Sequence, residues 1–172
     1  GQAPLLQRGG FMIGKLLGAL LICGAGALFF LLKGRQSRAE LRFTADMAAA
    51  LEQMETSVRF RRLPVPELLR EQSRRGDCGL YFDQARMMLK SGLPLQESWV
   101  QAVGNIPWQR PREVLLTLEW GGDTQRLCAN LQRCGEEMRS LGREMLTLRR
   151  EKQKLTLALT ASACGFLVIL LL

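Results

Sequence analysis

The sequence contains no histidine, and this absence excludes several classes of function. It removes the usual general base near neutral pH, Ser-His and Cys-His nucleophile pairs, and zinc sites that need imidazole. Aromatic residues make up only 6% of the chain, and β-branched runs are missing. The strong helix formers Leu, Met, Ala, Gln, Glu and Arg dominate instead. The 172 residues therefore predict an all-α protein with no catalytic, cofactor-binding or metal-binding residues.

Charge is missing from two long runs near the ends of the chain. Residues 16–32 and 155–172 contain none of the 24 Lys and Arg or the 16 Asp and Glu. Extended back to Met12, the first run spans roughly 30 Å at about 1.5 Å per residue, which matches the hydrocarbon core of a bilayer. We predict transmembrane helices at 12–32 and 155–172. Residues 1–11 are unpatterned, which makes Met12 a candidate start of the natural chain.

Basic residues flank the inner side of both runs. They are Lys33, Arg35, Arg38 and Arg42 after the first run, and Arg149, Arg150, Lys152 and Lys154 before the second. Lys and Arg near membrane ends stay on the cytoplasmic side, so we predict that residues 33–154 are cytoplasmic. A cleaved signal peptide would need small residues at these positions, which favours a retained first helix. A two-span sensor with an external receptor domain is the alternative topology, and it contradicts the charge rule.

Prolines and glycines divide residues 33–154 into a small bundle of about six helices. The first and last of these are continuous with the membrane helices. The boundaries follow from Pro at helix starts, Gly at helix ends and Asp123 as an N-cap. The expected helices are 37–62, 66–75, 80–90, 95–103, 111–120 and a last one that begins after Asp123.

The last helix carries a heptad pattern. Its apolar residues advance alternately by four and three positions, and Lys152 takes the place of one apolar residue before Leu155. The predicted seam consists of Leu127, Leu131, Cys134, Met138, Leu141, Met145 and Leu148. Such a seam pairs with another helix. It packs either on its own domain, most simply antiparallel to the first helix, or on a second copy in a homo-oligomer.

Two arginine clusters surround the proline break at residues 63–66. The first consists of Arg59, Arg61 and Arg62, and the second of Arg70, Arg74 and Arg75. Nucleic-acid binding requires aromatic residues for stacking or a base-reading helix, and the few aromatics here are expected to be buried, so no nucleic-acid partner is predicted. We predict that the first cluster binds an acidic partner or anionic lipid headgroups.

The five cysteines form no C-x-x-C pair, which is typical of a reducing compartment. Cys128 and Cys134 lie about 240° apart around a helix and cannot share a face. We expect them to be small buried apolar residues. Cys78 lies in a predicted loop, but without a histidine it is expected to be inert. The chain is therefore predicted not to be an enzyme.

Four passages resemble the stage III sporulation protein AB family of endospore-forming bacteria. They are LEQMETSVRFRRLPVPELL at 51–69, SGLPLQESWVQAV at 91–103, the Gly-Gly-Asp turn at 121–123 that follows EVLLTLEW, and the basic, chain-terminal membrane segment. The resemblance extends from Met12 to Leu172, and it rests on the order and spacing of these passages.

The resemblance implies a non-enzymatic membrane component of the channel between mother cell and forespore. In such a component the cytoplasmic domain couples a secretion-type sporulation ATPase to the channel. The implied partners are that ATPase, other membrane subunits of the channel and the lipid bilayer, and no cofactor is implied. Residues 91–95 are also similar to F-type platform proteins of type II secretion and type IV pilus machines, which is the alternative function. Those proteins usually carry two copies of the domain, and no second copy is found here.

Overall fold

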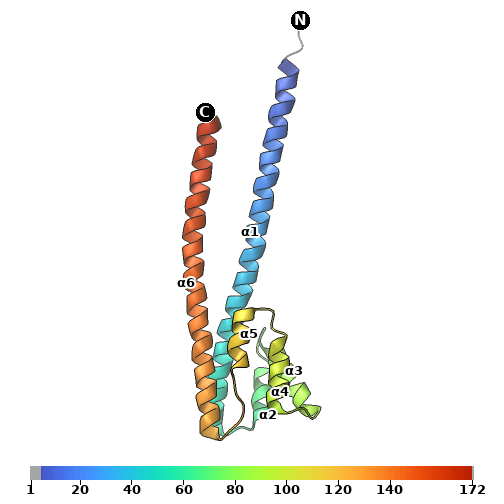
Figure 1. Cartoon of the computed structure of the whole chain (residues 1–172), viewed down its shortest axis with the longest axis vertical. Coiled ribbons are helices and arrows are strands. Elements are labelled where there is room, and N and C mark those ends of the chain that lie inside the picture. Colours follow the sequence, from blue (N-terminus) through green and yellow to red (C-terminus); the bar gives the residue numbers. More distant parts are fainter. Residues whose placement is uncertain (1–4, 172) are drawn as a thin grey trace. The chain divides into compact units, whose positions relative to one another are not determined.

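The computed structural model describes residues 5–171, and near the two ends it describes only some of the side chains. Within these residues there are six α-helices, one π-helical turn and no strand (Figure 1). This confirms the all-α class. The chain divides into two compact units, Gly1–Ala39 and Glu40–Leu172. The first unit, where it is described, is the N-terminal part of one helix, and the helical bundle belongs to the second.

The helices follow the order that the prolines and glycines predict. They are α1 (Leu5–Thr56), the π-helical turn η1 (Ser57–Arg61), α2 (Val65–Gln72), α3 (Gly79–Lys90), α4 (Leu95–Gly104), α5 (Gln109–Leu116) and α6 (Thr124–Leu171).

Among the residues that the structure describes, no helix contains a stretch that is both long and apolar enough to cross a membrane. Several side chains of the two predicted membrane helices, those of Met12, Cys23 and Cys164 among them, lie outside the described residues. The membrane helices at 12–32 and 155–172 therefore stay predictions.

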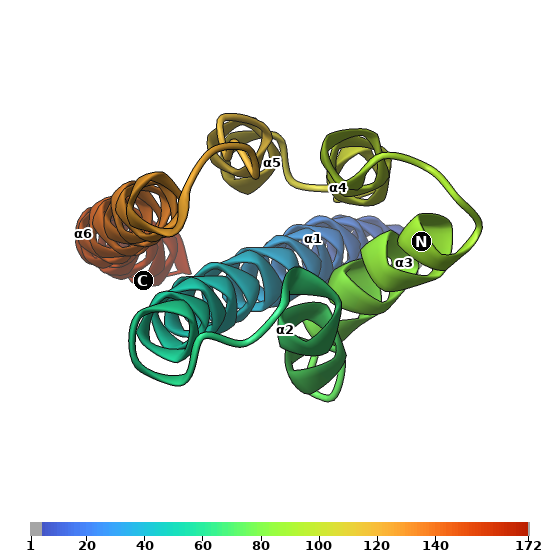
Figure 2. The same cartoon turned by 90° about the horizontal axis from the view of Figure 1, so that it is seen from below.

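In the second unit, α2 to α6 surround the C-terminal part of α1 (Figure 2). From α2 onward, each helix packs on the next along the chain, and α6 contacts η1. The apolar face of α1 is fully buried in this ring. It consists of Phe43, Met47, Leu51 and Met54, and Val58 is buried in η1. Hydrophobic burial of this face is the main force that holds the bundle together.

Aromatic side chains fill much of the core between the helices. The Trp99 ring lies 5.6 Å from Phe82 and 5.2 Å from Trp120, measured between centroids. The indole N–H of Trp99 donates a hydrogen bond of 2.9 Å to the Leu115 carbonyl, so its buried polar group is paired. Trp99 and Val103 are both fully buried and face inward.

Two predicted helix ends are confirmed by their hydrogen bonds. Gly92 follows α3 with φ of 98°, and the Leu93 N–H bonds to the Met88 carbonyl, which is a Schellman arrangement that requires a left-handed residue. Asp123 caps α6, because its carboxylate accepts a hydrogen bond of 2.9 Å from the Arg126 N–H.

Two other helix ends were predicted too late in the chain. α2 ends at Gln72 and not at residue 75, because the chain turns back tightly: a Cβ at Gly79 would lie 2.5 Å from the Ser73 carbonyl oxygen. α5 ends at Leu116 and not at residue 120. Leu118 and Trp120 are still buried, while Thr117 and Glu119 are exposed. Residues 117–122 are thus a non-helical α5–α6 linker, which leaves α5 through a turn at Thr117.

Candidate partner-binding surface

The first arginine cluster lies on a turn of unusual shape. η1 continues α1 as a π-helix, with Ser57 and Val58 buried. Arg62 then adopts φ of 48°, a left-handed conformation uncommon for a residue other than glycine. The helix has to end here, because residues that precede prolines avoid the α conformation and Pro64 and Pro66 follow. π-helical turns are rare in proteins, and those that occur often lie at functional sites. We call residues 59–62 the arginine turn.

The structure pairs two of these three arginines with carboxylates of the same chain. Arg59 lies 2.5 Å from Glu55 and Arg61 lies 3.1 Å from Glu71. In the described part of the chain Arg62 forms no ion pair. The guanidinium groups are exposed, whereas the side chains of Glu55 and Glu71 are only 14% and 26% exposed. Surface ion pairs contribute about 0–1 kcal/mol, so the carboxylates of a partner can share these guanidinium groups at little cost.

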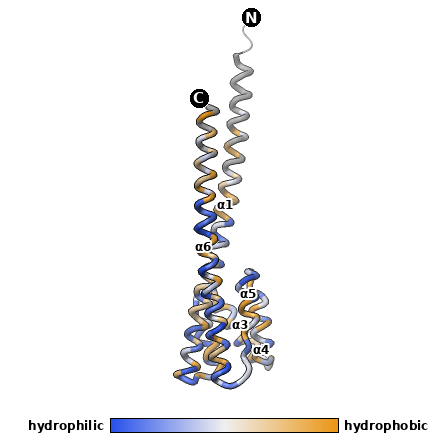
Figure 3. Tube along the Cα trace, turned by 60° about the vertical axis from the view of Figure 1, so that its left-hand side comes forward, coloured by the Kyte–Doolittle hydropathy of each residue, from blue (hydrophilic) through white to orange (hydrophobic). Residues whose placement is uncertain are grey.

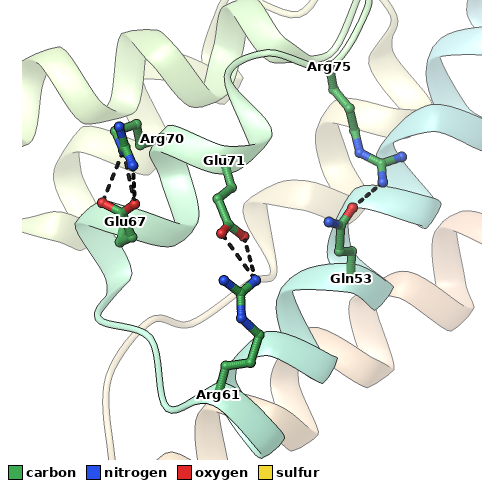
Figure 4. Close-up of polar contacts among 6 residues, drawn as sticks. All are labelled: Gln53, Arg61, Glu67, Arg70, Glu71 and Arg75. Carbon is green, nitrogen blue, oxygen red and sulfur yellow. Dashed lines mark hydrogen bonds and ion pairs between the residues drawn. The ribbon is translucent and has the colours of Figure 1, made fainter.

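The second arginine cluster belongs to the same surface. Figure 4 shows that Arg61 of η1, Arg70 of α2 and Arg75 after α2 project from neighbouring elements. Arg70 pairs with Glu67 and lowers the pKa of that carboxyl, mainly through a hydrogen bond between their side chains. Arg75 donates a hydrogen bond to Gln53 of α1. Residues 55–75 contain six arginines against three glutamates, so this surface has a net positive charge.

The heptad seam packs mostly within its own domain. Five of its residues are buried, namely Leu127, Leu131, Cys134, Met138 and Leu141. Met145 is partly buried against the core, whereas the side chain of Leu148 is 43% exposed. The seam residues up to Met145 therefore pack against helices of the same chain. Self-association stays a prediction, and it would have to use the part of α6 from Leu148 onward.

The partner of α6 within the second unit is the C-terminal part of α1, and the two run antiparallel. The Cys128 Sγ atom lies 4.0 Å from the Glu55 carbonyl oxygen, and Thr44 lies the same distance from the Met145 Sδ atom. Between these two contacts, a Cβ built at Gly135 would lie 3.6 Å from the Leu51 Cβ atom.

Sequence analysis missed the residues that permit this close approach. Cys128, Gly135 and Gly142 recur every seven positions beside the seam, and Gly142 faces Thr44. Each puts a small side chain, or none, where α1 passes. A small residue repeated once per heptad in a sequence otherwise rich in long side chains is the signal that would have revealed this contact.

The three cysteines of the bundle are free and buried, as predicted. Burial raises the pKa of Cys78 to about 11 and that of Cys134 to about 12. A thiol reacts as the thiolate, so both are unreactive near neutral pH. Cys78 precedes α3 directly and is fully buried there, although the sequence suggested a loop.

The structure thus defines an all-helical domain with a basic surface formed by the arginine turn and the second arginine cluster. The profile of the stage III sporulation protein AB family matches residues 15–172. The chain belongs to this family, and its role is in sporulation. No curated protein and no solved structure matches the chain.

Proposed function

We propose that the protein is a non-enzymatic membrane component of the secretion-like channel between mother cell and forespore. Helices at 12–32 and 155–172 cross the membrane, and residues 33–154 lie in the mother-cell cytoplasm. There the bundle binds a secretion-type sporulation ATPase and couples it to other membrane subunits of the channel. Family membership and the charge-free runs at both ends support this proposal.

The observation that carries the coupling role is the continuity of α6. This helix extends without interruption from Thr124 in the bundle to Leu171 (Figure 1). Along it, the hydrophilic residues 149–154 precede the mostly apolar residues from Leu155 onward (Figure 3). A continuous helix passes a tilt or rotation of the bundle to its far end, because the hydrogen-bonded backbone resists bending within each turn.

The position of the arginine turn favours a protein partner over lipid headgroups. The turn lies where α6 begins, since η1 packs on α6 and Glu55 contacts Cys128. From Cys128 to Leu155 the helix extends roughly 40 Å at about 1.5 Å per residue. The attraction of basic residues to a charged membrane falls off within a Debye length of about 8 Å. An acidic surface on a cytoplasmic protein is therefore the partner that we propose for this turn.

Co-purification of the full chain with the secretion-type sporulation ATPase of the same organism tests this function. We expect the two proteins to bind, and we expect Arg59→Glu, Arg61→Glu and Arg62→Glu together to weaken binding at least tenfold. The matched control carries Lys90→Glu, Arg133→Glu and Arg143→Glu, which change the net charge equally at exposed positions of the bundle. Absence of binding by the parent chain, or equal loss in both triple variants, would contradict the proposal.

The alternative is a platform subunit of a type II secretion or type IV pilus machine. It is favoured by residues 91–95, which form the tight corner between α3 and α4 around Gly92 and Pro94. Gene neighbours distinguish the two functions. Pilins and a prepilin peptidase would indicate the platform subunit, and a sporulation ATPase with small membrane subunits would indicate the channel component.

A further inference from the structure

The arginine turn presents an aromatic side chain to solvent. The Phe60 side chain is 76% exposed, more than any other large apolar side chain that the structure describes outside the two predicted membrane helices; Leu80 follows with 59%. Ala49, Gln53 and Thr56 of α1 lie on the same exposed side as Phe60. Its exposure therefore follows from the phase of the helix and does not depend on a particular rotamer.

A single exposed apolar residue is ordinary on a protein surface, and the surroundings of Phe60 are what distinguish it. The backbone on both sides is fixed: Val58 is buried, and Leu63 packs against the core. The pair between Arg61 and Glu71 ties the turn to α2. A partner that binds Phe60 does not have to order a flexible loop first, which removes one of the main costs of binding.

The charges around Phe60 restrict the kind of partner. Arg59, Arg61 and Arg62 flank it directly. Aromatic residues and arginine are the types enriched at the energetic centres of protein interfaces. An apolar pocket for the ring, bordered by carboxylates for the guanidinium groups, complements this arrangement. A second copy of this chain is a poor fit because its net charge is +8.

We propose, on the basis of the proposed function, that the Phe60 ring inserts into an apolar pocket on the ATPase. Acidic residues border this pocket and bind the arginines of the turn. A basic turn with an exposed aromatic side chain also suits an anionic membrane surface. The roughly 40 Å of α6 between this turn and the predicted membrane helix keeps the turn too far from the membrane surface for that binding. The arginines accelerate and orient the encounter, and the ring provides the apolar burial that slows dissociation.

The test measures ATPase binding to the full chain in nanodiscs that contain anionic lipid. Phe60→Ala should weaken binding at least about tenfold, and Phe60→Trp should stay within threefold of the parent. Leu80→Ala is the matched control, since it removes an apolar side chain of similar exposure from α3 and should change nothing. Both positions are exposed, so the three variants are expected to fold, and circular dichroism checks this.

Two results separate this inference from the proposed function. If the parent binds the ATPase but Phe60→Ala binds equally well, the docking is electrostatic alone and the insertion of Phe60 is wrong while the function stands. If the parent itself does not bind, both are wrong. As a second readout, benzoylphenylalanine at position 60 should form a photo-adduct with the ATPase. An adduct with lipid or with a second copy, or none at all, would overturn the inference.

Discussion

Cys134 shows how a single buried thiol links stability to pH. Burial raises its pKa to about 12 from about 9, with Glu137 adding to the effect. The folded state therefore holds the proton more tightly than the unfolded state does. The stability that this contributes is complete below pH 9 and is lost as the pH rises from about 9 to about 12, by up to about 1.4 kcal/mol per pH unit.

We expect Cys134→Ala to reduce this decline. The variant is less stable at pH 7.5 because it leaves a small cavity, so the slope against pH is the informative quantity and not the absolute value. The free energy of unfolding in urea, measured for both proteins between pH 7.5 and 10.5, gives the two slopes. Equal slopes would show that Cys134 does not hold its proton more tightly in the folded state.

At the scale of elements, the pairing of α1 with α6 depends on Gly135. A Cβ there would lie 3.6 Å from the Leu51 Cβ and 3.8 Å from the Ala48 carbonyl oxygen, which are ordinary contact distances. Gly135→Ala should therefore be tolerated and should stabilise the helix by up to about 1 kcal/mol. Gly135→Leu should destabilise the bundle by about 1–3 kcal/mol, because the larger side chain forces the helices apart. Ala129→Leu, at an exposed position of α6, is the size control in thermal unfolding.

The α5–α6 linker is held by side chains of the helices on both sides. The Gln96 side chain donates to the Leu118 carbonyl at 3.1 Å and accepts from the Trp120 N–H at 3.0 Å, as a neighbouring β-strand would. On the α6 side, Asn130 donates to the Glu119 carbonyl at 3.0 Å. The Leu118 and Glu119 carbonyls and the Trp120 N–H are thus paired although these residues belong to no regular element.

Gln96→Leu should destabilise the bundle by about 1–3 kcal/mol, because it leaves two backbone groups of the linker without partners. Gln101→Leu is the control, since this exposed glutamine of the same helix makes no side-chain hydrogen bond in the described structure. Unfolding midpoints in urea, followed by tryptophan fluorescence, compare the two variants. A loss of equal size in both would show that Gln96 does not hold the linker.

These elements show how far the sequence determined the fold. Proline and glycine positions predicted the order of the helices, and the heptad spacing predicted the buried face of α6. The linker was mistaken for helix because LLTLEW has strong helix formers, although the alternation of Thr117, Leu118, Glu119 and Trp120 has the period of two typical of extended chain. The π-helical turn and the contact at Gly135 depend on tertiary packing, which local propensity does not encode.

The sequence predicted that the arginine cluster lies on the surface of the protein. Long basic side chains rarely belong to a core, so an arginine cluster beside a proline break predicts a surface turn. What the sequence did not show is that Glu55 and Glu71 pair with Arg59 and Arg61. It also did not show that Phe60 is exposed among them, because aromatic residues are more often buried.

At the scale of the whole molecule, the proposed coupling requires α6 to stay continuous between the bundle and the predicted membrane helix. Thr147 is an exposed residue of this region, and its hydroxyl bonds only to the Arg143 carbonyl within α6. Thr147→Pro removes a helical hydrogen bond and kinks the helix, at a local cost of about 3 kcal/mol. The bundle contacts before Met145 are not affected by this change.

We expect Thr147→Pro to separate binding from function. The variant should reach the membrane and bind the ATPase as the parent does, yet spore formation should fall by at least tenfold, because a kinked α6 no longer transmits movement of the bundle. Thr147→Ala removes the same hydroxyl, keeps the helix straight and should sporulate normally. Normal sporulation of the proline variant would show that the domain acts as a tether for the ATPase and that rigidity of α6 is not needed.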